Sequence, residues 1–291
     1  MDERTALGRL RNRLSRAGDD AAVIDGLALT TDMLHDRTDF PAGRTRYTAG
    51  WRAVGASLSD LAAMGAVPVA AVAVYAAPAF EWQELASFVD GACDVCEAVG
   101  GEYVGGDLDD HGEFTVVTTA LGRAPEPVPR SGASPGETVC VTGTLGRSGA
   151  ALRLFEAGET RRANDLFRFR PRVDAASSLA GRATAMMDSS DGLARSLHQL
   201  AEASGCGMAI ESPLPVDDVV AEVASEEWRE LGVFFGEDFE LVCTLPESAV
   251  EPVRAELSVP LTRIGTVTGA GVGTGTVTLD GEPLPDRGYT H

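Results

Sequence analysis

The pattern of this sequence changes repeatedly between short runs of apolar, often β-branched residues and longer stretches with helical spacing. Runs such as VAAVAVYA (69–76) and FELVCTL (239–245) predict strands, and apolar residues spaced by three and four over 81–99 and 190–204 predict helices. This alternation predicts an α/β fold (α+β with mixed sheets). Further strands are expected over 21–32, 114–121, 137–143, 183–188 and 261–267, and further helices over 49–66, 147–158, 217–231 and 247–257.

The chain is long enough for two domains. With 291 residues it exceeds the usual size of a single core. The segment APEPVPR (124–130) follows a predicted strand and contains three prolines, which is typical of a linker. We therefore predict two domains, residues 1–126 and 127–291.

Charge excludes several classes of partner. The formal net charge is -20, and all 24 basic residues are arginine because the sequence contains no lysine. Such a chain repels nucleic acid and anionic membranes, so neither is expected as a partner. No apolar run has the length of a membrane span and the amino terminus does not resemble a signal peptide, so we expect a cytoplasmic protein. Most carboxylates are expected on a solvated surface suited to high salt.

The absence of lysine also limits the chemistry. A Walker-type phosphate loop, a protein-kinase active site and a pyridoxal Schiff base each need a lysine ammonium group. Phosphate chemistry in this chain must therefore use arginine, metal ions or backbone amides. The stretch TGTLGRSG (142–149) lies between a predicted strand and a predicted helix, where its glycines either approach a phosphate or form a tight turn.

Five cysteines at irregular spacing do not form a disulfide framework. Cys93 and Cys96 form a C-x-x-C, but no second pair exists to complete a zinc site. They lie in a stretch whose apolar residues have helical spacing, so we predict buried cysteines on a helix.

Several aspartates stand at predicted strand ends or among small residues. Taken singly, Asp20 is explained equally well as a turn residue, Asp60 as an exposed helix position, and Asp188 or Asp191 as a helix cap. Together they predict a site for hard divalent cations, because Mg²⁺ prefers oxygen ligands and keeps room for substrate phosphates. The residues in question are Asp20, Asp32, Asp60, Asp107, Asp188 and Asp191.

The order of short motifs along the chain then becomes informative. From about residue 18 to the carboxy terminus, the sequence resembles the thiamine-monophosphate kinase family, within the superfamily of aminoimidazole ribonucleotide synthetase. The combination of SLSDLAAMGA and MDSSDGL is the most specific part of this resemblance. The motifs are GDDAAV, TTD, SLSDLAAMGAVP, YVGGD, RSGASPGE, MDSSDGL, GEDFEL and GYTH.

The resemblance implies a two-domain aminoimidazole ribonucleotide synthetase-like architecture. It implies a homodimer formed through an amino-terminal ATP- and metal-binding domain, and a reaction of ATP with thiamine phosphate that yields ADP and thiamine diphosphate. The implied Mg²⁺ ligands are Asp20, Thr30, Thr31, Asp32, Asp60, Asp107, Asp188 and Asp191. The implied catalytic residues are Asp60, Asp107, Arg130 and Asp188. The implied ATP contacts are Gly106, Asp107, Arg130 and Ser190. The residues implied to bind the acceptor are Asp39, Glu237 and Tyr289.

Asp39 marks a departure, because the family usually has a histidine there. A carboxylate at this position can still attract the cationic thiazolium ring. Three alternatives stay open at this stage: cyclisation of a purine intermediate, activation of an amide or carbamoyl group, and non-catalytic binding of nucleotide or divalent cations. The first cysteine is Cys93 and the chain ends GYTH, which argues against the superfamily members that use a reactive terminal cysteine.

Overall fold

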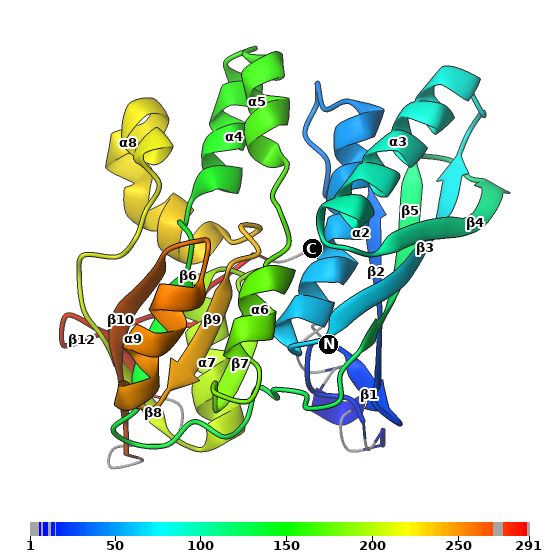
Figure 1. Cartoon of the computed structure of the whole chain (residues 1–291). Helices are drawn as coiled ribbons and strands as arrows, with labels where there is room; N and C mark the ends of the chain where they lie inside the picture. Colours follow the sequence, from blue (N-terminus) through cyan, green and yellow to red (C-terminus); the bar gives the residue numbers. More distant parts are fainter. Residues whose placement is uncertain (1–5, 7, 11–12, 15, 270–275, 290–291) are drawn as a thin grey trace.

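Two mixed β-sheets lie side by side in the computed structural model, which describes residues 6, 8–10, 13–14, 16–269 and 276–289 (Figure 1). The first sheet uses strands from residues 22–123, and the second uses strands from residues 138–283. Helices fill the space between the sheets and cover the second sheet from outside (Figure 1). The predicted α/β class with mixed sheets is confirmed.

The first sheet has five strands in the order β1-β2-β5-β3-β4. All neighbours are antiparallel except β3 and β4, which are joined by a crossover through a helix, as parallel strands require. The strands are β1 (Ala22–Ile24), β2 (Leu27–His35), β3 (Val67–Ala77), β4 (Glu102–Asp110) and β5 (Thr115–Arg123).

The second sheet has seven strands in the order β12-β11-β8-β10-β6-β9-β7. Only β8 and β11 run parallel. The strands are β6 (Thr138–Thr142), β7 (Ala185–Asp188), β8 (Gly207–Ile210), β9 (Leu241–Leu245), β10 (Leu261–Thr268), β11 (Val277–Leu279) and β12 (Glu282–Pro283).

The helices form two groups around the sheets. In the first half, α2 (Arg46–Ala63) and α3 (Trp82–Ala98) cover one face of the first sheet. In the second half, the helices are α4 (Arg147–Glu156), α5 (Thr160–Phe167), α6 (Val173–Leu179), α7 (Leu193–Ser204), α8 (Asp218–Ala224) and α9 (Glu247–Glu256), with a 3₁₀ turn at Ser225–Glu227 and a π-helical segment at Glu230–Phe235.

Helix α2 lies at the centre of the molecule and is buried on nearly all sides. One core cluster contains Leu58 and Leu61 of α2 together with Leu179 of α6 and Met186 of β7, so α2 joins the two halves. Its other side crosses α3 so closely that a Cβ at Gly50 would lie 2.1 Å from the Phe88 carbonyl oxygen. Burial and this backbone contact hold α2 in one position.

The structure also corrects several details. Strands β4 and β8 and helices α5 and α6 were not predicted, because β4 is rich in glycine and aspartate, the other three are short, and tertiary pairing overrides these weak local signals. Cys96 is buried as predicted, but Cys93 is exposed, so the prediction was wrong for that residue. The predicted boundary between residues 126 and 127 falls in the connection from β5 to β6 and stays a prediction.

Within the described part of the chain, we find no helix with the length and apolarity needed to cross a membrane.

Candidate active site

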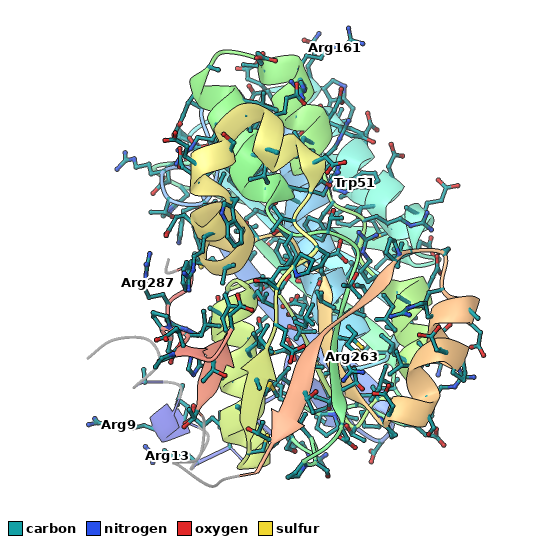
Figure 2. All side chains as sticks on the ribbon, turned by 90° about the vertical axis from the view of Figure 1, so that its left-hand side faces the viewer. Arg9, Arg13, Trp51, Arg161, Arg263 and Arg287 are labelled. Atoms are coloured by element: carbon teal, nitrogen blue, oxygen red, sulfur yellow. The ribbon has the colours of Figure 1, made fainter. Side chains whose placement is uncertain are left out.

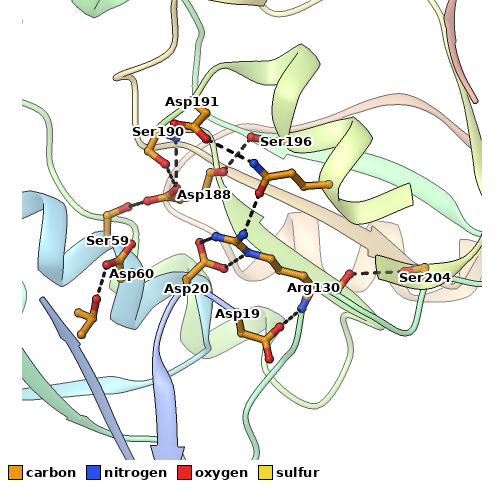
Figure 3. Close-up of polar contacts among 12 residues, drawn as sticks. Asp19, Asp20, Ser59, Asp60, Arg130, Asp188, Ser190, Asp191, Ser196 and Ser204 are labelled. Atoms are coloured by element: carbon orange, nitrogen blue, oxygen red, sulfur yellow. Dashed lines mark hydrogen bonds and ion pairs between the residues drawn. The ribbon is translucent and has the colours of Figure 1, made fainter. Parts of the chain in front are cut away.

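Three of the predicted aspartates converge between the two halves (Figure 3). Asp20 precedes β1, Asp60 lies near the end of α2, and Asp188 is the last residue of β7. One carboxylate oxygen from each residue lies within 4.8 Å of the others. Asp20 and Asp60 are 40 positions apart in the sequence, and Asp60 and Asp188 are 128 positions apart. The packing around α2 brings them together into one acidic cluster.

Hydroxyl groups hold the two aspartates nearest the centre of this cluster. Thr30 on β2 donates a hydrogen bond of 2.5 Å to Oδ2 of Asp60. Ser59 donates to Oδ2 of Asp188 at 2.7 Å, and both the backbone N–H and the hydroxyl of Ser190 donate to Oδ1. Because these donors come from elements of both halves, they fix the carboxylates in orientation as well as in position.

Burial and like charge both act on these carboxylates. Burial raises the pKa of Asp60, and the charges of Asp32, Asp188 and Asp20 raise it further. Burial also raises the pKa of Asp188 to about 7, with the charge of Asp20 as a second cause. Carboxylates placed this close share protons or a cation, because isolated like charges in a dry site are costly.

Arg130 lies at the edge of the acidic cluster. Its Nε and Nη2 donate to the two oxygens of Asp20 at 2.9 and 3.1 Å, a bidentate pair with an almost fully buried carboxylate. Its Nη1 donates to Gln199, which in turn donates to Asp191 at 3.3 Å (Figure 3). Arg130 and Asp191 therefore belong to the same network as the cluster, although Asp191 lies outside the three-carboxylate group.

Residues of the TTD run point to opposite faces of the first sheet. Thr30 and Asp32 face α2, where Ser57 donates to Asp32 at 2.8 Å. Thr31 is exposed and donates to the Thr118 carbonyl across the strand pair. Side chains alternate along a strand, so the three residues cannot all aim their side chains at one site.

Asp107 and Gly106 lie at the far edge of the first sheet. Asp107 is exposed on β4 and pairs with Val74 of β3, whereas Asp32 lies on β2. Three strand spacings separate β2 from β4, or about 14 Å. Within one chain Asp107 is therefore away from the cluster. A Cβ at Gly106 would lie 1.7 Å from the Ala73 carbonyl oxygen, so packing against β3 by itself requires glycine there.

The three predicted acceptor residues approach one another near α2. Burial raises the pKa of Tyr289 to about 12, and the charges of Glu237 and Asp39 add to the shift. The Tyr289 hydroxyl donates to the Thr38 carbonyl at 3.2 Å, and Asp39 Oδ2 accepts from Thr38 and from the His35 amide. The carboxy-terminal segment thus reaches the loop after β2 from the opposite half of the molecule.

The glycine-rich loop of residues 142–149 is occupied by a carboxylate of the chain itself. Asp238 accepts from the Gly146 amide at 2.5 Å and from the Ser148 amide at 2.9 Å, at the start of α4. Gly146 has a left-handed φ of 91°, as a tight turn requires. These two amides are therefore already used, and the turn explanation fits better than the phosphate explanation.

The donor set of the cluster fits a magnesium ion. It offers oxygen atoms only, from three carboxylates, and the hydroxyls of Thr30 and Ser59 orient two of them. Such hard ligands are those that Mg²⁺ selects, and Asp32 lies close enough to act electrostatically on Asp60.

Sequence reasoning missed four polar residues of this region. Ser57 and Ser59 are fully buried on α2, and Gln199 connects Arg130 to Asp191. Arg52, also on α2, is 3% exposed and bonds to Glu237. Their helices contain other polar residues as well, so no local pattern singled these four out or indicated which partner lies opposite.

Comparison with known proteins first identifies the class of protein to which this chain belongs. The family model "AIR synthase related protein, N-terminal domain" matches residues 18–124, and "AIR synthase related protein, C-terminal domain" matches residues 134–278. The chain is therefore an AIR synthase-related protein.

Individual relatives narrow the class. A thiamine-monophosphate kinase of Halobacterium salinarum is 62% identical over the full length of both chains, and one of Methanospirillum hungatei is 42% identical over 100% of this chain and 99% of its own. The structure of AaThiL complexed with AMPPCP and TMP has a TM-score of 0.89 and 28% identity, and covers 100% of this chain and 97% of its own. The chain belongs to the thiamine-monophosphate kinase family.

Magnesium should stabilise the protein in a pH-dependent way. Burial raises the pKa of Asp188 to about 7 in the folded state, above its ordinary value of 3.8, so the metal-free folded state binds more protons than the unfolded state and its free energy of unfolding falls as pH rises between these values. Because a cation competes with the protons, millimolar Mg²⁺ should raise the unfolding temperature strongly near pH 8 and little near pH 5. Thermal unfolding with magnesium or EDTA measures this. An equal effect at both pH values would contradict the site.

Proposed function

We propose that this chain transfers the γ-phosphoryl group of ATP to thiamine phosphate and produces thiamine diphosphate and ADP. The observation that carries the proposal is the convergence of Asp20, Asp60 and Asp188 between the two halves. The kinase names of full-length relatives support the same reaction, and so does the AaThiL complex with AMPPCP and TMP.

Asp20, Asp60 and Asp188 would hold Mg²⁺, with Asp32 as a further candidate ligand. When bound, the ion would neutralise phosphate charge. Asp107 and the Thr31 side chain lie on other surfaces of the same protomer, so their predicted metal contacts require a second copy or, for Thr31, its backbone carbonyl.

The chain's own residues supply alignment and charge. Phosphoryl transfer needs the donor and acceptor in line more than it needs covalent help, and the acceptor phosphate is itself a nucleophile. Ser190 bonds to Asp188 and its carbonyl accepts from the Glu237 amide at 2.7 Å, so the proposed ATP contact and an acceptor residue are joined directly. Arg130 offers a buried positive charge beside the cluster. No lysine is needed.

The proposed acceptor residues suit a cation. The charges of Glu237 and Asp39 both act on Tyr289, and Phe235 packs edge-on against Tyr289 at a centroid distance of 5.6 Å. A thiazolium ring would be attracted by the carboxylates and by the aromatic faces. Asp39 therefore takes the place of the usual histidine without removing the basis for binding the acceptor.

The activity itself is the first test. Purified protein with ATP, magnesium and thiamine phosphate should form thiamine diphosphate, which chromatography detects.

Asp60→Asn should lower kcat by at least about a thousandfold, because a proposed metal ligand that also contributes to the negative charge of the cluster is lost. Circular dichroism should show an unchanged fold. Retained turnover in this variant would show that Asp60 is not a metal ligand required for catalysis. Absence of product with the wild type would contradict the proposed reaction.

We also propose a homodimer through the open face of the first sheet. Helices cover only one face of this sheet, and the other exposes apolar side chains on four of its strands. A continuous apolar face of this kind marks an interaction surface, and a second copy of the same face can pair with it about a two-fold axis. The residues are Ile24, Leu27, Leu29, Met33, Val67, Val69, Val72 and Val104.

A charge placed on this face should separate the protomers. The wild type should elute at twice the chain mass of 30.4 kDa in size-exclusion chromatography with light scattering, whereas Leu29→Glu should elute as a monomer. Trp82→Glu is the matched control, because Trp82 is 77% exposed but lies on α3, away from the open face. A monomeric wild type at micromolar concentration, or a dimeric Leu29→Glu variant, would refute this interface.

We further propose that the protein works in a cytoplasm of high salt. Surface arginines such as Arg263 and Arg287 (Figure 2) pair with glutamates, yet the net charge stays at -20. Screening of this self-repulsion by 2 M KCl should raise the unfolding temperature by about 10 °C relative to low salt, which is a few kcal/mol. Sucrose at equal osmolality is the control, since it excludes itself from the surface without screening. Equal effects of the two solutes would count against the proposal.

A further inference from the structure

Arg52 is an almost fully buried cation that pairs with the proposed acceptor residue Glu237. It lies on α2, is 3% exposed, and sits among three aromatic rings of the second half. Its guanidinium carbon lies 3.6 Å from the centroid of Phe167 and 5.3 and 5.5 Å from those of Phe169 and Phe239. Burying an arginine this deeply is costly unless its donors are all directed at specific acceptors.

Its donors are directed at the segment that carries the acceptor carboxylate. Nη2 donates to Glu237 Oε2 at 2.5 Å and to the Glu237 carbonyl at 3.3 Å. Nη1 donates to the Phe167 carbonyl at 2.6 Å and to the Ser148 hydroxyl, which itself donates to the Glu237 carbonyl. Arg52 therefore binds both the side chain and the backbone of Glu237.

The backbone of this segment needs such support. Glu237 and Phe239 both have left-handed φ values, 60° and 55°, which are unfavourable for residues with a side chain. Asp238 between them is anchored by the amides of α4, and Phe239 stacks on Phe169 at 4.0 Å. On the side of Glu237, Arg52 supplies the corresponding anchor.

The charges near Tyr289 also indicate a role for Arg52. Without Arg52, Glu237 and Asp39 would place two negative charges near Tyr289. With Arg52 paired to Glu237, a buried cation balances one of these two negative charges.

We propose that Arg52 is the positioning residue of the acceptor site, which holds the Glu237 carboxylate in place and balances its charge. The proposal rests on the proposed function, since it assigns Glu237 to the acceptor. Arg52 belongs to the amino-terminal half and Glu237 to the carboxy-terminal half, so the pair also ties acceptor binding to the relative placement of the two halves.

Steady-state kinetics of three variants test this. Arg52→Met should raise the KM for thiamine phosphate by at least about tenfold, the usual effect of losing a charge-assisted hydrogen bond, while the KM for ATP changes by less than about threefold. Arg52→Lys keeps the charge but loses the planar fork, so it should recover part of the loss.

Arg172→Met is the matched control. Arg172 forms a partly buried bidentate pair with Glu240 in the second half, at 2.7 and 2.5 Å, but none of its bonds reaches an acceptor residue. This variant and Arg52→Met should both unfold at a lower temperature than wild type, and Arg172→Met should keep the acceptor KM within about twofold of wild type.

The results for these variants distinguish a positioning role of Arg52 from a purely structural one. If Arg52→Met and Arg172→Met have the same acceptor KM, or if the KM values for both substrates rise together, the positioning role is refuted and Arg52 is only structural. If Arg52→Met does not fold, Arg52→Lys decides, because an unchanged acceptor KM in that variant would refute the role. Failure of the proposed function is seen separately, as absence of product with the wild type.

Discussion

The repulsion among carboxylates gathered around one end of α2 is the constraint on which the site depends. Asp20, Asp60 and Asp188 lie within a few ångströms of one another in a partly dry environment, an arrangement that costs free energy in the absence of a cation or protons. Core packing of α2 and hydroxyl donors from both halves offset this cost. The fold therefore maintains an acidic cluster whose repulsion the proposed divalent cation would relieve.

Helix α2 relates this cluster to the rest of the site. Arg52 and Asp60 lie eight residues apart on it, about 12 Å along a helix that rises 1.5 Å per residue. Packing against α3 through Gly50 on one side and against α6 and β7 on the other leaves the helix no freedom to shift. The proposed acceptor residues and the acidic cluster are thus held at a fixed separation by one rigid element, which is the alignment that phosphoryl transfer needs.

Sequence reasoning succeeded where the signal was local or repeated. Strong strand and helix periodicity gave the class and most elements, and the ordered motifs gave the family. It failed where long-range pairing decides: β4, with its glycines and aspartates, is a strand only because β3 lies beside it. Adjacent residues also misled it. Thr30 and Thr31 belong to one motif, yet strand alternation sends their side chains to opposite faces.

By itself, the sequence determined the mixed α/β class, the exclusion of lysine-dependent chemistry, and the set of aspartates from which the proposed cation site is drawn, because residue types and spacing are enough for these. Only the tertiary structure decided which of those carboxylates meet, that Asp107 stands apart from them within one chain, and that Arg52 faces Glu237. The physical reason is that these relations join residues far apart in the chain. They depend on how α2 packs between two sheets, which no local pattern specifies.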